Sequence, residues 1–356
     1  MRRLVFTGVA TPGRRLVWLA CATWAALLPV GQPSGAGAAA ASNVEGPYHF
    51  GLDFITESLA SDGTFLFDFE PYSLTDPGNF MVSEGSLQGR SAAEIQRAVA
   101  LAIEDAFRSV DTSDAGRTLA VQIHEGLAPV DVSGRRLNVI MGQSALPALT
   151  SFGESQTGAW DSPFINNDAY VAAIYLDEID GMGDQLVDYV EFDDAINAIA
   201  GTTAHEIGHV FDAEHVDIPS GSGEPYPLMA VSTNGLTAEM RLTARRFSDL
   251  GGAAASVAQL LLTNAGTALR GDFNLDGSVD GLDIGRLVSN FGRTDALWQE
   301  GDANGDHRVN GQDIGWLVSQ WTGSPPALAA ALMAIPEPGA GVLGAVALGL
   351  WMCRRW

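Results

Sequence analysis

The chain has 356 residues, of which 46% are hydrophobic, and this length supports one sizeable core with a small accessory module. Its 43 acidic residues outnumber its 19 basic ones, all of them arginine, and give a formal net charge of −24. So acidic a surface repels the phosphates of nucleic acids and of anionic lipids, and we expect neither as a partner. The two cysteines, Cys21 and Cys353, lie in the end segments, so the sequence between them offers no disulfide.

The first 41 residues have the order of a secretory signal peptide. Arginine pairs precede the apolar run 16–30, and small residues follow it at 34–42. This order predicts cleavage near 39–41, removal of residues 1–41 and export of the remaining chain.

Residues 45–265 predict one mixed unit of the α+β class. Strand-like patterns cover 48–59, 118–124, 136–142 and 169–177. Helices are expected at 91–110, 192–211 and about 236–263, and a surface loop at 151–168. The first helix opens with Ser91 and Glu94, which are spaced as in a capping box.

One short segment, 202–215, holds three of the chain's six histidines. His205 and His209 stand four residues apart, so on a helix both imidazoles lie on one face, within reach of one ion. Glu206 beside them completes the pattern H-E-x-x-H. In that pattern two imidazoles bind zinc, and the carboxylate acts as a general base that moves a proton from the activated water to the leaving amine.

A catalytic zinc ordinarily has a third protein ligand, and His215 offers the right residue type six positions after His209. The stretch from His205 to His215 resembles the metzincin metallopeptidase motif, in which a glycine normally stands at the position of Asp212. Asp tolerates a positive φ better than most residues, although Asp212 itself stays an alternative third ligand. The resemblance implies an endopeptidase with one catalytic Zn²⁺ that hydrolyses protein or peptide substrates, with Glu206 as its general base.

The metzincin resemblance carries two further expectations. Members of that family place a methionine turn beneath the metal, and Met229, in the turn-rich stretch 223–235, follows the third histidine in the right order. By the same resemblance, the strand 169–177 is the edge strand that pairs with an extended substrate.

Segments 271–292 and 301–323 repeat one pattern. Each opens with oxygen ligands at positions 1, 3, 5, 9 and 12 and a backbone carbonyl at position 7, an arrangement that suits Ca²⁺. The first loop offers Asp272, Asn274, Asp276, Asp280 and Asp283, with the carbonyl of Ser278. The second loop offers Asp302, Asn304, Asp306, Asn310 and Asp313, with the carbonyl of Arg308. One helix follows each loop, so we expect a small all-α module.

These duplicated loops resemble dockerin type I domains over nearly all of 271–323, which implies two bound Ca²⁺ ions and a cohesin-like partner. The second loop has fewer carboxylates, and His307 stands where a glycine normally makes the sharp turn, so we expect weaker calcium binding there. The pairs 281–282 and 311–312, at the family's recognition positions, depart from the common Ser/Thr type. A contact within the chain or with the cell surface therefore stays an alternative to cohesin.

The end of the chain indicates a sorting signal. Residues 324–334 form a linker rich in Pro and Ala, and 335–356 combine a Pro-Glu-Pro triplet, a short apolar stretch and a final pair of arginines. This tail resembles the PEP-CTERM signal of Gram-negative bacteria, which implies membrane association before processing by an exosortase, and delivery to the cell envelope, the cell surface or the medium. A plain C-terminal membrane anchor is the alternative.

Three hypotheses for function follow. The leading one is an exported zinc endopeptidase that is tethered or assembled through its calcium module. The second is a non-catalytic adhesin or scaffold-associated binding protein with a structural metal site. A polysaccharide-degrading enzyme ranks last, because 45–265 shows no recognisable paired-carboxylate site. Glu206 separates the first two, since a structural zinc site does not need that carboxylate.

Overall fold

The computed structural model describes residues 46–60, 68–83, 85–145, 152–159, 162, 165–185, 188–218, 220–247, 256–325 and 327–328. The predicted signal peptide, the sorting tail and most of the linker lie outside these ranges. Within them, every helix is too short or too polar to cross a lipid bilayer.

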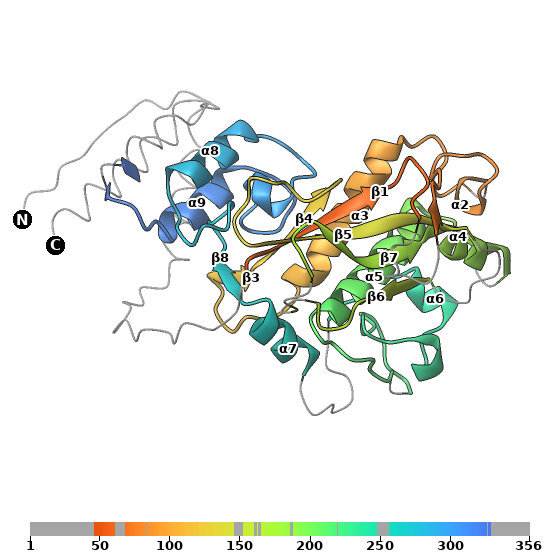
Figure 1. The fold of residues 1–356 in the computed structure, drawn as a ribbon. Helices are drawn as coiled ribbons and strands as arrows, with labels where there is room; N and C mark the ends of the chain where they lie inside the picture. The colour runs from red at the N-terminus through yellow and green to blue at the C-terminus, as the bar shows by residue number, and fades with distance from the viewer. Residues whose placement is uncertain are drawn as a thin grey trace, which may run out of the picture. The chain divides into compact units, whose positions relative to one another are not determined.

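A mixed β-sheet forms the frame of the α/β unit (Figure 1). Its strands are β1 (Tyr48–Phe54), β4 (Val121–Glu125), β5 (Arg135–Ser144), β6 (Gly153–Ser155) and β7 (Ala169–Tyr175), in the spatial order β4-β1-β5-β7-β6. Strands β4, β1, β5 and β7 are parallel, whereas β6 runs antiparallel to β7. The short β2 (Phe69–Glu70) pairs antiparallel with β5. The predicted mixed fold is thus confirmed.

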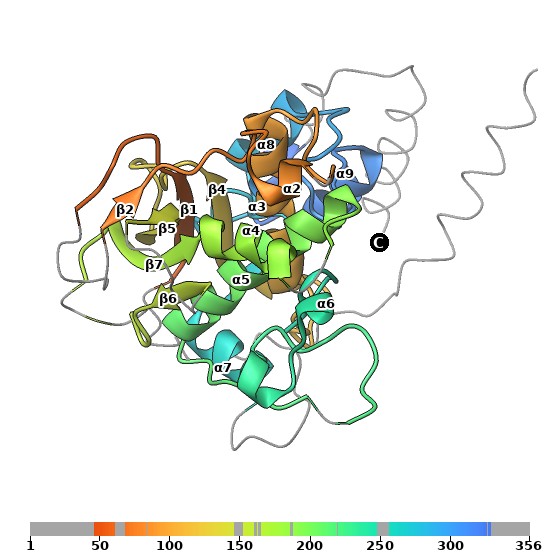
Figure 2. The ribbon, with the colours of Figure 1, turned by 90° about the vertical axis from the view of Figure 1, so that its right-hand side faces the viewer.

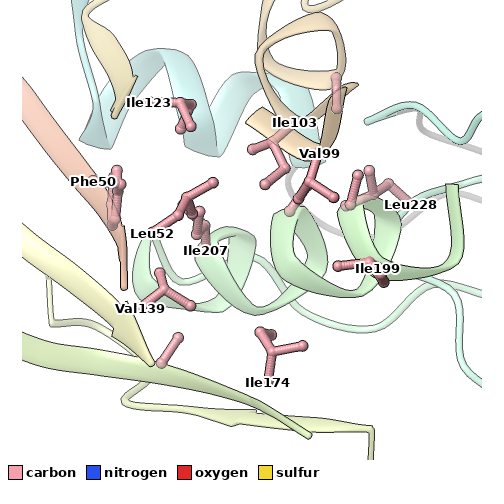
Figure 3. Packing of buried hydrophobic residues seen from close by; sticks show 14 of the residues in the cluster. Phe50, Leu52, Val99, Ile103, Ile123, Val139, Ile174, Ile199, Ile207 and Leu228 are labelled. Atoms are coloured by element: carbon pink, nitrogen blue, oxygen red, sulfur yellow. The ribbon is translucent and has the colours of Figure 1, made fainter. Parts of the chain in front are cut away.

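Two long helices, α3 (Ala92–Arg108) and α5 (Phe192–Val210), pack against each other and against one face of the sheet (Figure 2). Figure 3 shows Val99 and Ile103 of α3 meeting Ile207 of α5 and Leu52 of β1. Burying one such aliphatic side chain contributes about 1.5–3 kcal/mol. The helix α4 (Leu176–Gln185) follows β7 directly, and α2 (Phe80–Ser83) packs on it.

The alternation of β1 divides its side chains between two environments. Tyr48, Phe50 and Leu52 are fully buried on the helical face. His49 points to the other face and is also fully buried. A period of two is what a strand imposes.

The start of α3 agrees with its predicted capping box. The Ser91 hydroxyl accepts from the Glu94 N–H at 3.2 Å, and the Glu94 carboxylate accepts from the Ser91 N–H at 2.8 Å. These bonds satisfy two backbone donors that a helix N-terminus otherwise leaves unpaired.

Two expectations about the sheet are wrong. The predicted loop 151–168 contains β6, whose three residues are too few to show alternation in the sequence. Because β6 pairs with β7, the strand predicted at 169–177 lies inside the sheet, and β6 ends the strand order instead. The strand also ends at Tyr175, where α4 begins.

The expected helix over 236–263 is also interrupted. The described parts of that range hold α6 (Ala238–Arg241) and α7 (Val257–Asn264), separated by residues without helical structure at 243–247. The turn η1 (Ser232–Asn234) precedes α6. After α7, β8 (Thr267–Leu269) pairs with β3 (Arg117–Leu119), so the α/β unit continues a few residues past 265.

The repeat builds a second hydrophobic cluster around the helices α8 (Gly281–Ser289) and α9 (Gly311–Ser319), with the turn η2 (Trp298–Glu300) between them. Trp298 is fully buried, and its backbone N–H donates to Glu104 of α3 at 2.9 Å. The Gln122 amide of β4 donates to the carbonyl of Phe273 at 2.8 Å. The repeat therefore makes buried hydrogen bonds with the α/β unit.

Candidate metal centre

The helix α5 presents His205 and His209 on one face. Their Nε2 atoms lie 3.1 Å apart, and the Nε2 of His215 lies 3.0 Å from that of His209. One nitrogen of each ring lies within 4.8 Å of the others, so the three imidazoles can share one ion. The spacing of the histidines in the sequence predicts this group.

Backbone carbonyls orient two of the rings. The Nδ1 of His205 lies 2.9 Å from the carbonyl oxygen of Leu228, and that of His209 lies 2.6 Å from the carbonyl oxygen of Ala213. A proton on Nδ1 leaves Nε2 with its lone pair free for a metal, which is the usual second-shell arrangement of histidine ligands.

A turn after α5 carries the chain from His209 to His215. The helix ends at Val210, and Asp212 has φ 65°, in the left-handed region that Asp tolerates better than most residues. The Ala213 N–H closes the turn on the Gly208 carbonyl at 3.1 Å. Asp212 thus supplies the conformation of the turn, while His215 supplies the third nitrogen of the group.

Met229 packs against α5 close to the histidines. Its side chain is almost fully buried, and a Cβ added to Gly208 would lie 2.6 Å from its sulfur. Its carbonyl accepts from the N–H of Val216, next to His215. Met229 therefore packs against the helix that carries His205 and His209.

Glu206 is held beside the histidines by the edge strand. Its carboxylate accepts from the Ser155 hydroxyl of β6 at 2.7 Å. Burial raises the pKa of Glu206 to about 7, and the hydrogen bond from Ser155 partly opposes that rise. A carboxyl poised near neutrality suits general acid–base catalysis.

A cleft of about 220 Å³ opens beside Glu206 and is lined by β6, α5 and the chain around η1. Arg241 lines it, with its guanidinium 4.7 Å from the ring centre of Phe152. The cleft is therefore lined by a candidate base, by His205 from the group of three imidazoles and by one cation.

The donor set fits zinc. Burial is the largest cause that lowers the pKa of His205, His209 and His215, so the neutral imidazole that binds metal is the favoured form. Three imidazole nitrogens are a ligand set of catalytic zinc sites.

The first loop of the repeat has the donors of a calcium site. The Asp283 carboxylate accepts from the Phe273 N–H at 2.7 Å and from the Asp280 N–H at 2.9 Å. Burial raises the pKa of Asp272 to about 6 and that of Asp283 to about 7. Buried carboxylates whose charge is disfavoured fit a hard cation that would neutralise them. The backbone turns at Gly277, with φ 88°.

The second loop differs at that turn. His307 adopts φ 60° there, and its imidazole lies 3.1 Å from Asp105 of α3 and 3.9 Å from Asp302. The hydrogen bond to Asp105 raises the pKa of His307 to about 9. A positive charge near Asp302 opposes a cation, in line with the predicted weaker second site. The first loop has its own left-handed non-glycine residue, Leu275, with φ 58°, which the ligand pattern does not predict.

The two remaining histidines form a pair that their sequence spacing does not predict. His49 of β1 and His124 of β4 are brought together by parallel strand pairing, with Nδ1 and Nε2 3.1 Å apart. The other nitrogen of His49 lies 2.8 Å from the Ser133 carbonyl. Only a prediction that β1 and β4 are neighbours would have found this pair.

Comparison with known families identifies one part of the chain. Residues 270–320 match the dockerin type I domain, as the repeat predicts. No curated protein matches the chain. Dockerin domains bind calcium and cohesin modules, so the match supports a calcium-binding module that tethers the chain in an assembly. Leu282 of α8, within the matched segment, is 64% exposed.

Proposed function

We propose that this protein is a zinc-dependent endopeptidase that its dockerin module tethers to an assembly. The observation that carries the proposal is the convergence of three imidazoles beside the buried carboxylate of Glu206. A structural zinc site has no use for that carboxylate, which favours catalysis over the alternative of a binding protein.

The edge strand offers a place for the substrate. Within the described structure, β6 ends the strand order, so an extended peptide can add to its outer edge by main-chain hydrogen bonds. Ser155 of that strand already contacts Glu206, so a peptide on β6 would lie beside the candidate base. A substrate side chain would enter the cleft lined by Arg241.

The residues have separate roles in the proposed reaction. His205, His209 and His215 would hold the metal. A bound zinc ion supplies a Lewis acid for the scissile carbonyl and a water of lowered pKa. Glu206 accepts a proton from the attacking water and delivers it to the nitrogen of the leaving amine, as the amide C–N bond breaks. Ser155 orients the Glu206 carboxylate.

Casein cleavage by zinc-loaded wild type and Glu206→Gln tests the proposal. We expect the variant to retain zinc and to lose about 10²–10⁴-fold in kcat, the usual contribution of a general base. Glu239→Gln, at a fully exposed carboxylate of α6, is the matched control and should cleave normally. Equal cleavage by wild type and Glu206→Gln, or zinc binding without cleavage by either, contradicts the proposal.

A further inference from the structure

A second cleft, of about 410 Å³, lies between α3, α5, the segment before Phe247 and the second calcium loop. Four arginines line it: Arg108, Arg245, Arg246 and Arg270. One acidic residue, Asp105, is also part of the lining, and it contacts His307. Four of the chain's 19 basic residues thus meet in one cleft of a protein whose net charge is −24.

Of the four arginines of this arginine cleft, Arg245 is the buried one, with 95% of its surface covered. Among the residues that the structure describes, its Nε and Nη2 atoms have no hydrogen-bond partner. Its Nη1 donates to the Leu228 carbonyl at 3.4 Å. The guanidinium lies across Gly201 of α5, where an added Cβ would come within 2.9 Å of Cζ.

A buried charge without a counter-ion is unstable. Burial, followed by the nearby charge of Arg241, lowers the pKa of Arg245 to about 9. Guanidinium groups in proteins are normally retained in such places by a carboxylate or another oxyanion, which they bind through paired N–H donors.

The other arginines leave the cleft positive. Arg108 is partly neutralised by Glu104, with Nε and Oε1 3.4 Å apart. Arg270 donates from Nε to the Ala115 carbonyl at 2.8 Å, which does not offset its charge. Arg246 is an exposed part of the lining, and among the described residues it forms no ion pair.

We propose that the arginine cleft binds a divalent oxyanion, a sulfate or phosphate group, with Arg245 and Arg246 as its principal ligands. The cleft is far larger than the roughly 30 Å³ of one water molecule, so the group can be a free ion or the end of an ester. This site is distinct from the cleft beside Glu206, with which it shares no lining residue.

Titration calorimetry of the full, metal-loaded chain with sodium sulfate tests the proposal, at constant ionic strength and with calcium present. We expect saturable binding that weakens at least about 10-fold in Arg245→Met and about 5-fold in Arg246→Gln, because each loses charge-assisted hydrogen bonds. Arg117→Gln is the control, since Arg117 is 42% exposed and lies outside the cleft. It should bind sulfate as wild type does.

A second arm with p-nitrophenyl sulfate separates the two sources of the group. Tighter binding of the ester than of sulfate assigns an esterified ligand, and binding of sulfate alone assigns the free ion. The absence of saturable binding of both, or equal affinities in wild type and Arg246→Gln, overturns the proposal. Arg246 is exposed, so its variant decides the question even if Arg245→Met does not fold. A loss of affinity in Arg246→Gln also excludes sulfate binding at the histidines, since Arg246 does not line the cleft beside Glu206.

Discussion

The protein contains two groups of histidines. The distances between neighbouring ring nitrogens are nearly the same in both groups, but only one group has an arrangement that could hold a metal ion. In the triad, His205, His209 and His215 turn their Nε2 atoms toward one point. In the pair, His49 uses one nitrogen on the Ser133 carbonyl and the other on His124. Closeness of imidazoles is therefore not enough, because the number of free lone pairs and the backbone partners decide which group could hold a metal ion.

The largest effect is expected from a substitution that removes one histidine of the triad. His215→Ala should weaken zinc binding more than about 100-fold, because loss of even a second-shell partner costs 10–100-fold. The control, His124→Ala, removes an imidazole from the pair and should leave zinc affinity unchanged. Competition with a chelating dye measures both. A similar loss of zinc affinity in the two variants would show that the triad and the pair do not differ in metal binding.

The pair should instead control stability in acid. Burial lowers the pKa of His49 to about 4 and that of His124 to about 3, so both stay neutral in the folded protein. The unfolded chain takes up protons below pH 6.5, so stability is lost as the pH falls from 6.5 toward 4. Between pH 6.5 and 5 the loss is about 2 kcal/mol for each imidazole kept neutral.

Urea unfolding at pH 7 and at pH 5 checks this expectation. The double variant His49→Gln/His124→Gln should lose less stability over this range than wild type, because it lacks the groups that bind protons on unfolding. An equal pH dependence in the two proteins would show that the pair is not held neutral.

The residues of the triad could be predicted from the sequence, whereas those of the pair and of the arginine cleft could not. His205, Glu206 and His209 lie on one helix, and the following turn brings in His215, so local geometry links spacing to position. The calcium loops are equally local. The pair depends on which strands are neighbours, and Arg108, Arg245 and Arg270 come from segments far apart in the chain. The edge strand β6 was missed because three residues carry too little pattern.

Arg241 should set the substrate preference of the cleft beside Glu206. Its cation lines the cleft, so a substrate with an acidic side chain there should be preferred. Arg241→Gln should lower kcat/KM for such a peptide about 10-fold, with a much smaller effect on the matched amide peptide. A uniform loss on both peptides would assign Arg241 to structure instead.

His307, the sixth histidine, allows a test in the repeat. His307→Gly restores the usual glycine at a left-handed position and removes a positive charge near Asp302. Relief of the φ strain alone is worth about 1 kcal/mol, so calcium binding at the second loop should tighten about 5-fold. Calorimetry with calcium measures this, in the background of Asp272→Ala to silence the first loop. Weaker binding would show that the contact between His307 and Asp105 matters more than the strain.

The smallest effect concerns the support of Glu206. The Ser155 hydroxyl lowers the pKa of Glu206, so Ser155→Ala should raise it. The acidic limb of the kcat/KM profile should then move to higher pH, because the Glu206 carboxyl stays protonated, and cannot act as a base, up to a higher pH. The shift should be below about one pH unit, the scale of one hydrogen bond. A move toward lower pH would contradict this role.

One backbone oxygen joins the two clefts. The carbonyl of Leu228 faces both the Nδ1 of His205 and the Nη1 of Arg245. Any ligand that repositions the guanidinium acts on the same acceptor that orients the imidazole, which gives the two sites a shared element for thermodynamic coupling. Coupling of this kind is reciprocal. If the oxyanion changes the affinity for zinc by some factor, zinc changes the affinity for the oxyanion by the same factor.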